Sequence, residues 1–477
     1  MISPTECRVG LLAQLSLLGL LASCVGRPAG FDEGDEDDLG TTTEDSDSAG
    51  DSTEGSSTDE VGTTTSETGS GTETETGVVD GCNPVQFADP ELEVRVRLRL
   101  GLPDDVPIDA EAMAGLDRLI LDGDVHSLEG LECALALEEL HLGGSAIDNL
   151  APIAGLPALR ELFLSVSGTP DIQPLATLPA LEKLEVLLFD GFDVAILAES
   201  KAPLSRLIFT SSVLENPQEL GALVSLEELR LSWTLLPDLS FIGELEQLRT
   251  LWTYNAGIED IAPVAQVTGL ETLELYGSPF GDIGPLAGHP ALIELGCGSS
   301  GVDDISAVAT IPTLESLNVS ATAVADLGPL TGHPALGSLG VGETPVVDLS
   351  PLATVPTLWR LVAYAMPNLG PLPEGLSVVE VHLSDSGLTD ISPMATWAPF
   401  LHWDLMNNQI EDLGPLLAAE WMFDPDPDLC HELYLDGNPL APENEAVVAE
   451  LCQGGVSTFA SEPALSCAVG SCGLMPP

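Results

Sequence analysis

Three histidines near the C-terminal end are the residues of this chain best suited to chemistry. His382, His402 and His431 each lie one or two residues from a carboxylate, in the stretches "EVH", "HWD" and "HEL". Imidazole and carboxylate groups held together can bind a divalent metal or transfer protons. On neighbouring parallel strands, about 4.8 Å apart, the three would form a metal site or a catalytic cluster. The alternative, which we favour, is an ordinary polar rim. The carboxylates concerned belong to Glu380, Asp404 and Glu432.

The rest of the sequence carries no further signature of catalysis. It contains no H-E-x-x-H, no G-x-S-x-G, no phosphate-binding loop and no C-x-x-C pair. His289 and His333 share one position of a repeated "GHPAL", which indicates a structural role. We therefore expect no enzymatic activity, no cofactor and no bound metal. A hydrolase or metal-dependent enzyme that uses the three histidines is the less favoured alternative.

The histidines belong to a repeat of 22 residues that begins at Leu116. Each unit reads L-x-x-L-x-L, then a turn, then a segment like I-x-D-I-x-P-L. The alternation predicts a short strand whose leucines point inward and whose x side chains point outward. Stacked units pair their strands in parallel, and the prolines favour short 3₁₀ turns on the return path. Units begin at Leu116, Leu137, Leu159, Leu181, Leu204, Leu226, Leu248, Leu270, Leu292, Leu314, Leu336, Leu358, Val378, Phe400 and Cys430.

An aspartate recurs in the return segment of most units. We expect its carboxylate to accept hydrogen bonds from nearby backbone N–H groups; a metal-binding role is the alternative, although the spacing matches no calcium-binding loop. The positions are Asp148, Asp171, Asp238, Asp260, Asp282, Asp304, Asp326, Asp348, Asp390 and Asp412.

The unit resembles the 22-residue leucine-rich repeat of bacterial internalins, LxxLxLxxNxIxDIxPLxxLxx. Residues 314–335, "LESLNVSATAVADLGPLTGHPA", match it almost position by position. The resemblance covers roughly residues 85–440. It implies an α/β solenoid: a leucine-rich repeat horseshoe with a parallel β-sheet on the concave face and 3₁₀ or short helical turns on the convex face. Members of this family mostly bind partners through the concave face.

The buried asparagine of the family pattern is largely replaced in this chain. Asn408 fills that position, and hydroxyl residues fill it in six other units. We expect the hydroxyls to bond backbone carbonyls in place of the asparagine amide. They are Ser145, Ser278, Ser300, Thr322, Thr344 and Ser386.

The outward strand positions hold side chains that folding does not require. Aromatic residues make up only 4% of the chain, yet "LWTYNAGIEDIAPVAQVTGLETLELY" (251–276) contains three. Tyr and Trp with Arg are enriched in interfaces, so we predict a ligand-binding surface. The alternative is stabilisation of the sheet by cross-strand pairs, such as Arg249 with Glu228 and Glu271. The candidate ligand-binding residues are Arg230, Trp233, Arg249, Trp252, Tyr254, Tyr276, Trp359 and Tyr364.

Both ends of the repeat resemble caps. Asp89 and Pro90 are typical of a helix start, so we expect a helix to about Leu100, with a strand as the alternative. We assign residues 81–115 to an N-terminal helical cap, 116–440 to about fifteen repeats and 441–477 to a C-terminal cap. Residues 187–203 lose the D-I-x-P-L segment, and "LAAEWMFDPDPDLCH" is an insertion in unit fourteen.

The N-terminus has the pattern of an export signal. Residues 1–23 combine Arg8, an apolar run and small residues, as signal peptides do. The end of this segment, "LASC", resembles the lipobox of bacterial lipoproteins, which implies a lipidated Cys24. An ordinary cleaved signal and an uncleaved anchor over Val9–Gly26 are the alternatives. Val25 and Gly26 provide no acidic retention signal, which favours the outer membrane or cell surface.

The net charge of the chain limits the classes of partner that it can bind. The chain has 76 acidic and 13 basic residues and a net charge of −63, so nucleic-acid binding, which requires clustered Lys and Arg, is excluded. Residues 24–80 are rich in acid, Ser, Thr and Gly, and we expect a disordered tether. We therefore predict a lipid-anchored, exported module that binds a protein or a glycan. A structural envelope lipoprotein without a specific ligand is the alternative.

The cysteines in the two caps predict disulfides, as expected in an exported protein. We pair Cys82 with Cys133 across the N-terminal cap, and leave the connectivity of the C-terminal group open. Cys297 occupies a leucine position and is predicted to be a small buried residue. The C-terminal candidates are Cys430, Cys452, Cys467 and Cys472.

Overall fold

The computed structural model describes residues 82–398 except 124, 145, 148, 167–169 and 237, and also residues 401–419 and 431–467. The chain divides into two units, Met1–Glu73 and Thr74–Pro477, and all described residues belong to the second. The predicted signal peptide, Cys24 and the tether lie outside the described residues, as do Cys430 and Cys472.

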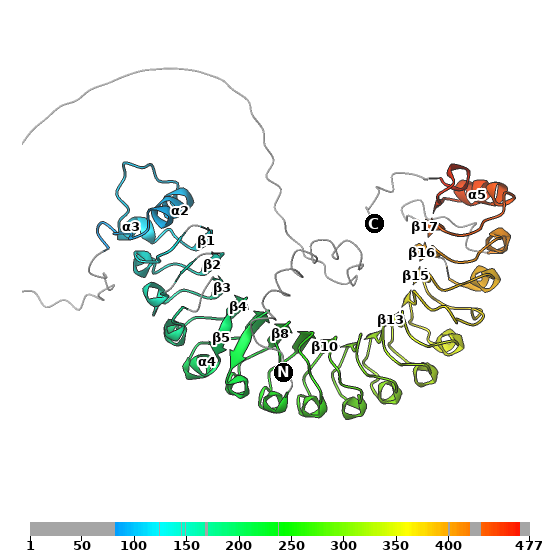
Figure 1. The fold of residues 1–477 in the computed structure, drawn as a ribbon, viewed down its shortest axis with the longest axis horizontal. Helices are drawn as coiled ribbons and strands as arrows, with labels where there is room; N and C mark the ends of the chain where they lie inside the picture. Colours follow the sequence, from blue (N-terminus) through cyan, green and yellow to red (C-terminus); the bar gives the residue numbers. More distant parts are fainter. Residues whose placement is uncertain are drawn as a thin grey trace, which may run out of the picture. The chain divides into compact units, whose positions relative to one another are not determined.

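The solenoid is built on one parallel sheet of sixteen strands, in which each strand pairs with that of the next coil (Figure 1). The strands line the inner side of the curve, and the leucines of each strand point away from this face into the core. The strands are β1 Arg118–Asp122, β2 Glu139–Gly143, β3 Glu161–Ser165, β4 Lys183–Leu187, β6 Arg206–Thr210, β8 Glu228–Ser232, β9 Thr250–Tyr254, β10 Thr272–Tyr276, β11 Glu294–Gly296, β12 Ser316–Asn318, β13 Ser338–Gly340, β14 Arg360–Val362, β15 Glu380–His382, β16 His402–Asp404, β17 His431–Tyr434 and β18 Val456–Phe459.

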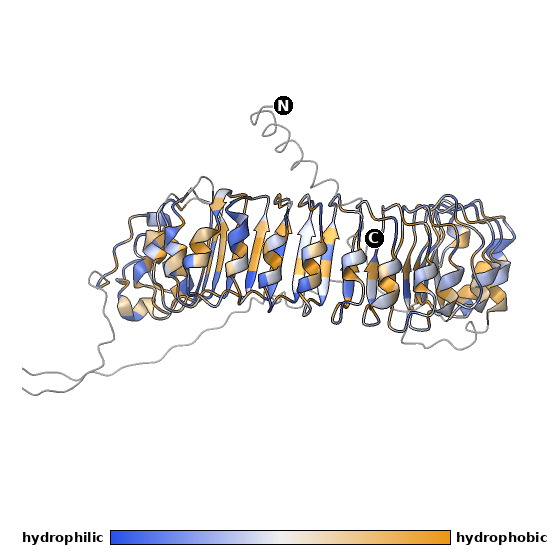
Figure 2. Cartoon of the chain, turned by 90° about the horizontal axis from the view of Figure 1, so that it is seen from below, coloured by the Kyte–Doolittle hydropathy of each residue, from blue (hydrophilic) through white to orange (hydrophobic). Residues whose placement is uncertain are grey.

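The return segments form short 3₁₀ helices on the convex side, as the prolines predict (Figure 2). Proline at the first turn suits these helices because the missing N–H has no partner there in any case. They are η1 Leu131–Cys133, η2 Ala151–Ile153, η3 Gln173–Thr177, η4 Pro217–Ala222, η5 Ser240–Glu244, η6 Ala262–Gln266, η7 Gly284–Leu286, η8 Ser306–Thr310, η9 Gly328–Leu330, η10 Ser350–Thr354, η11 Ser392–Thr396, η12 Gly414–Ala418 and η14 Pro463–Leu465.

The repeated aspartates start these helices. In each described coil that has one, Oδ1 accepts a hydrogen bond from the backbone N–H two residues later, which confirms the predicted local role. Asp348 illustrates the geometry: Ser350 donates its backbone N–H at 2.8 Å and its hydroxyl at 2.9 Å. Asp148 lies outside the described residues. The same bond is formed by Asp171, Asp238, Asp260, Asp282, Asp304, Asp326, Asp390 and Asp412.

The predicted hydroxyl substitutes for the buried asparagine also behave as expected in most coils. Thr322 and Thr344 each donate to the carbonyl three residues earlier at 2.6 Å, and Ser300 does so at 2.5 Å. Ser386 instead donates to Ala363 of the preceding coil. Ser278 departs from the pattern, because its buried hydroxyl has no hydrogen-bond partner.

The irregular segment after β4 forms structure that the repeat did not predict. Strand β5 (Asp190–Asp193) pairs in parallel with β7 (Val213–Glu215) of the next coil as a separate two-stranded sheet. A short helix, α4 (Ala195–Glu199), replaces the 3₁₀ turn. Phe192, on β5, is fully buried and contacts Phe189 and Phe209 edge-on.

A helix caps the N-terminal end, as predicted in preference to a strand. Helix α2 (Pro90–Leu100) begins after Asp89, whose side chain accepts a bond from Glu91 N–H at 2.9 Å. A second helix, α3 (Ala110–Met113), follows. The other oxygen of Asp89 accepts the N–H of His126 at 2.6 Å, which joins the cap to the first coil. The predicted disulfide between Cys82 and Cys133 is present.

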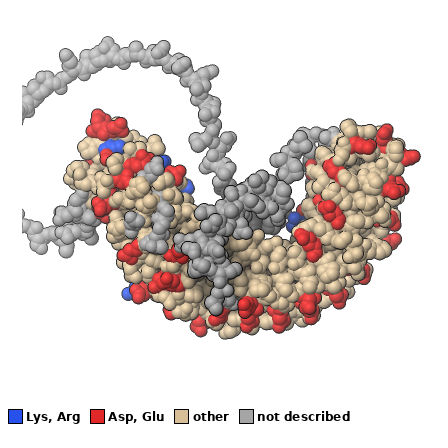
Figure 3. Space-filling model, in the orientation of Figure 1, with Lys and Arg blue, Asp and Glu red and all other residues tan. Residues whose placement is uncertain are grey.

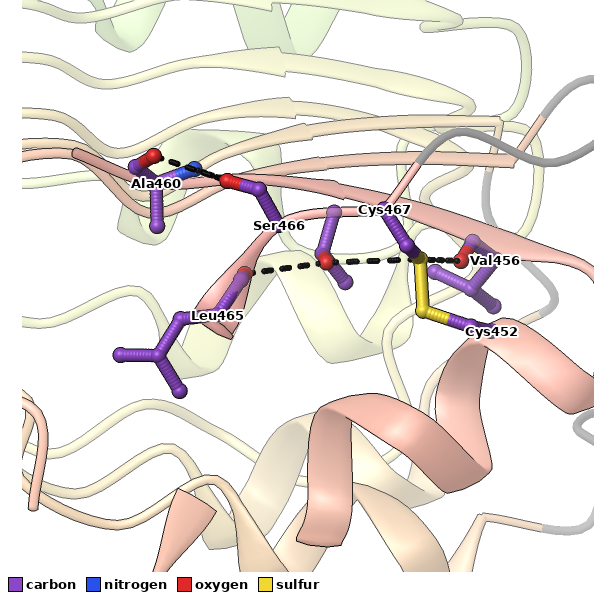
Figure 4. Close-up of a disulfide and its surroundings, with 7 residues drawn as sticks. Cys452, Val456, Ala460, Leu465, Ser466 and Cys467 are labelled. Atoms are coloured by element: carbon purple, nitrogen blue, oxygen red, sulfur yellow. Dashed lines mark hydrogen bonds between the residues drawn. A yellow bond between two sulfur atoms is a disulfide. The ribbon is translucent and has the colours of Figure 1, made fainter. Parts of the chain in front are cut away.

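The C-terminal cap contains helix α5 (Asn444–Gln453) and then strand β18, which adds a final strand to the sheet. A disulfide joins Cys452 at the end of α5 to Cys467 (Figure 4). Near it, the Thr458 hydroxyl donates to Leu465, and Ser466 bridges both backbone groups of Ala460. Cys297 is a free, fully buried thiol, as expected. Within the described ranges, no helix is long and apolar enough to cross a membrane.

Candidate functional site

Four aromatic side chains lie in contact on the concave face of strands β8 to β10. We call Trp233, Trp252, Tyr254 and Tyr276 the aromatic cluster. The rings of Tyr254 and Tyr276 stack with centroids 5.0 Å apart and planes 6° apart. Tyr254 also contacts Trp252 at 6.3 Å and Trp233 at 5.4 Å. The four rings therefore form one continuous surface.

The repeat explains why these rings point to solvent. Tyr254 and Tyr276 are partners in the register of β9 and β10, so they occupy the same place on neighbouring coils. Leu251 and Thr253, on either side of Trp252, are fully buried. Because successive side chains of a strand face opposite sides, Trp252 must lie on the open face. The predicted orientation of these three aromatics is confirmed.

Trp233 occupies a backbone position that rarely carries a large side chain. It follows β8 with a φ of 54°, in the left-handed region, and is 50% exposed. The equivalent position of other coils holds residues of many types, among them Asn255, Asn407, Ala321 and Leu188, all with positive φ. The fold therefore gains nothing obvious from tryptophan at this site.

The predicted arginines have different surroundings. Arg230 lies opposite Trp252 in the strand register and forms an ion pair with Glu228. Arg249 lies at the edge of the sheet, where it approaches Glu271 at 3.4 Å and the Gly269 carbonyl at 3.1 Å. The suggested pair between Arg249 and Glu228 is wrong: Glu228 binds Arg206, its register partner on β6, and Arg230, two residues later on its own strand.

Trp359 and Tyr364 lie on another part of the face from the aromatic cluster, although Tyr276 of the cluster, after burial and Glu343, helps to raise the pKa of Tyr364. Strands β11 to β13 lie between β10 and β14, the strand next to both residues. The intervening face is covered by small side chains, and the ring of Tyr276 leans over Gly298 while that of Tyr364 leans over Gly342. Trp359 is 48% exposed beside Gly337. The sequence pattern predicted that Trp359 and Tyr364 lie on the concave face. It did not show that three strands separate β14 from the strands of the aromatic cluster.

Sequence reasoning missed two carboxylates beside the aromatic cluster. Glu274 lies between Trp252 and Gly296 in the register of β9, β10 and β11. Its carboxylate occupies the space that a side chain at position 296 would fill. Glu294, on β11, accepts a bond from the Thr272 hydroxyl at 3.3 Å. Burial, and then the charge of Glu294, raise the pKa of Glu274 to about 7.

We expect Glu274→Gln to stabilise the protein at alkaline pH. A carboxyl with a raised pKa favours the folded state below its unfolded pKa of about 4.5, and this contribution is lost as pH rises through 7. A shift of one unit corresponds to about 1.4 kcal/mol. After a discount for partial exposure, the variant should gain about 1 kcal/mol at pH 8 and nothing at pH 4. Urea denaturation at both pH values measures the difference, with the exposed Glu246→Gln as control. An equal effect at both pH values would contradict the proposed cause.

The structure brings together two of the three candidate histidines. His382 and His402 lie on β15 and β16 with ring centroids 5.1 Å apart. His382 Nε2 is 3.1 Å from Glu380, which also binds Arg360 at 2.6 Å. His402 Nδ1 lies 3.4 Å from Glu432.

The inclusion of His431 in this group is wrong. In the register of β16 and β17, the partner of His402 is Glu432. His431 precedes Glu432 by one residue and lies opposite Val456 of β18. The place beside His402 is instead taken by Tyr434, with ring centroids 4.9 Å apart. Tyr434 donates its hydroxyl to Glu432 at 3.2 Å.

The charges around these histidines compensate one another. The hydrogen bond from His382, together with Arg360, lowers the pKa of Glu380 to about 2 against the effect of burial. Burial lowers the pKa of His382, but bonds to Asp404 and Glu380 outweigh burial and raise it. Burial and the neighbouring His382 lower the pKa of His402. Across the described residues, no group of three or more His, Cys, Asp or Glu is arranged to hold a metal ion.

His289 and His333 have the structural role that their repeat position predicts. Both are almost fully buried. The Nε2 of His289 lies 3.0 Å from the Val267 carbonyl, and that of His333 lies 3.1 Å from the Ile311 carbonyl, in each case one coil earlier.

One parallel strand per coil, backed by 3₁₀ helices, defines a leucine-rich repeat solenoid. The fold class predicted from the repeat is confirmed. No protein-family model matches the chain, and no curated protein sequence matches it either.

Solved structures of similar fold include three bacterial proteins. An internalin of Listeria monocytogenes is 20% identical with a TM-score of 0.44, covering 82% of this chain and 97% of that chain. A leucine-rich repeat protein of Leptospira interrogans is 17% identical with a TM-score of 0.49, covering 73% and 97%. The functional domain of InlJ from Listeria monocytogenes is 16% identical with a TM-score of 0.48, covering 73% and 80%. At these identities the likeness is one of fold.

Proposed function

We propose that this chain is an exported, lipid-anchored module that binds a protein partner through the aromatic cluster on its concave face. The observation that supports the proposal most directly is the continuous surface of four partly exposed rings on strands whose leucines already form the core. Aromatic side chains provide large contact areas at small entropic cost, which is why they dominate the energetics of interfaces.

The competing explanation is that the rings stabilise the sheet. It explains less well why aromatic residues are concentrated on these strands. An aromatic pair contributes about 0.5–1.5 kcal/mol beyond its buried area. Elsewhere on the concave face, ion pairs between neighbouring strands provide comparable contacts, for example Arg118 with Glu139 and Arg206 with Glu228. Trp233 adds a large, half-exposed side chain at a turn position where other coils fold with residues as small as Ser211 and Ala321.

Attachment to the cell envelope is the second part of the proposal. Lipidation of Cys24 would hold the module at the membrane surface, and residues 24–80 would separate it from the lipid. A flexible chain of that length has a root-mean-square span of about 40 Å, increased by its negative charge. Figure 3 shows acidic side chains along the outer rim of the solenoid, and such charge suits a module kept away from anionic lipid.

The test compares the chain with the double variant Trp252→Ala/Tyr254→Ala in quantitative pull-down from envelope extracts. We expect partners captured by the unaltered chain to be reduced at least tenfold, because truncation of two interface aromatics typically costs several kcal/mol. The matched control, Leu98→Ala/Val224→Ala, removes two exposed apolar side chains away from the concave face. Its partners should be unchanged.

Three outcomes would count against this function. Identical partners for both variants would exclude the aromatic cluster as the binding surface and favour a structural lipoprotein. Ligands released as saccharides in place of polypeptides would indicate glycan binding. Stoichiometric metal in the purified chain that is lost in His382→Ala would revive the enzymatic alternative.

A further inference from the structure

Most acidic side chains on the concave face have a cationic partner. Glu228 binds two arginines, and Glu271 and Glu380 bind one each. Similar ion pairs occupy the first coils, where Lys183 approaches Glu161 at 3.5 Å. This pairing is expected, because a carboxylate that loses water without a compensating charge is costly.

Glu274 and Glu294 lack such a partner within the described part of the chain. Among the described residues, neither carboxylate has a cation within ion-pair distance, and Glu274 also has no hydrogen-bond donor. The two lie on adjacent strands and repel each other. Glu274 is nevertheless held beside Trp252 and over Gly296, in the more enclosed part of the face. Folding alone gives no reason for placing this pair there.

The surroundings of the pair are those of a cation-binding surface. On one side lie Trp252 and the stacked rings of Tyr254 and Tyr276, whose faces attract a cation. On the other side, the carboxylate of Glu274 lies over Gly296 and the ring of Tyr276 lies over Gly298, so the acidic group and the aromatic rings are presented next to each other. A guanidinium group can stack on an aromatic ring and bond a carboxylate with two N–H groups at once.

We propose that the aromatic cluster, together with Glu274 and Glu294, binds an arginine side chain presented by the protein partner. The proposal rests on the function proposed above and names the chemistry of the contact. The charge of the surface selects this occupant: a bound guanidinium neutralises two carboxylates that the chain itself leaves without a cation. A neutral saccharide would stack on the same rings and leave the carboxylates unpaired. A metal ion would find two carboxylate residues where a stable site needs more oxygen ligands.

The experiment uses a defined probe. Binding of the peptide acetyl-Gly-Arg-Gly-amide to the full chain is measured by tryptophan fluorescence and by NMR, next to the same peptide with citrulline, which has the same shape and no charge. We expect the arginine peptide to bind at least tenfold more tightly than the citrulline peptide. The double variant Glu274→Gln/Glu294→Gln should remove this preference.

The matched control is Glu227→Gln/Glu246→Gln, which removes the same charge from exposed positions on nearby coils and should keep the preference. Because Glu274 has no stabilising partner, we expect the test variant to fold, and circular dichroism checks this. Equal binding of the two peptides, no binding of either, or an unchanged preference in Glu274→Gln/Glu294→Gln would overturn the proposal. If Trp252→Ala/Tyr254→Ala still abolishes partner capture in that case, the proposed function stands and the arginine contact alone is wrong.

Discussion

Replacing Phe192 with alanine should lower the free energy of unfolding by about 4 kcal/mol, the middle of the range for fully buried phenylalanines. Phe192 is completely buried, and its ring contacts those of Phe189 and Phe209 at 5.4 and 5.0 Å. Phe189 and Phe192 lie in the segment that has lost the D-I-x-P-L pattern, and Phe209 lies on β6 of the next coil. Removal of the Phe192 ring would leave a cavity that the rigid neighbouring strands could not close.

Urea denaturation followed by circular dichroism measures the effect. The control is Leu188→Ala in the same coil, where the side chain is 49% exposed and little stability should be lost. Coils of a solenoid are stabilised largely by their neighbours, so a cavity here should weaken the coils on both sides. A loss below about 1 kcal/mol for Phe192→Ala would mean that this irregular coil packs independently of the core.

The repeat was sufficient to predict most of the fold. A period of 22 residues with alternating leucines leaves few arrangements other than stacked parallel strands, because each strand must bury one face. The recurring prolines and aspartates similarly predicted the 3₁₀ turns and the bonds that start them. These features are local, and each is repeated many times along the chain.

The parts of the fold that were missed are those without repetition. Residues 187–203 have lost the pattern, so nothing in the sequence indicated that β5 would pair with β7. Strand β18 reads V-S-T-F and lacks the leucine spacing, and it joins the sheet because α5 and the disulfide to Cys467 direct the chain back to it. Such elements depend on tertiary contacts and are hard to infer from a single sequence.

The candidate site likewise has some features that the repeat predicts and others that depend on tertiary contacts. The 22-residue spacing of Tyr254 and Tyr276 predicted their stacking, because strand register follows from the repeat. A count from the first leucine position would also have separated His431 from His402. The importance of Glu274 could not be found in this way, because its lack of a cation depends on what all the surrounding side chains contact.

The second large effect is expected at Asn408. Its amide donates to the carbonyls of Leu383 and Leu405 at 2.9 Å and of Met406 at 3.2 Å. Its oxygen accepts the backbone N–H groups of Ser386 at 3.0 Å and Leu388 at 3.1 Å. One fully buried side chain thus satisfies backbone groups of two adjacent coils.

Asn408→Ala should therefore lower the free energy of unfolding by about 4 kcal/mol, because each buried polar group left without a partner costs about 1–3 kcal/mol. The matched variant is Thr322→Ala at the equivalent position, where the hydroxyl donates once, to Val319, and accepts weakly from Val324 N–H at 3.4 Å. About 1 kcal/mol should be lost there. Urea denaturation of both variants measures the difference. Equal losses would contradict the view that the Asn408 amide links neighbouring coils while the Thr322 hydroxyl serves its own.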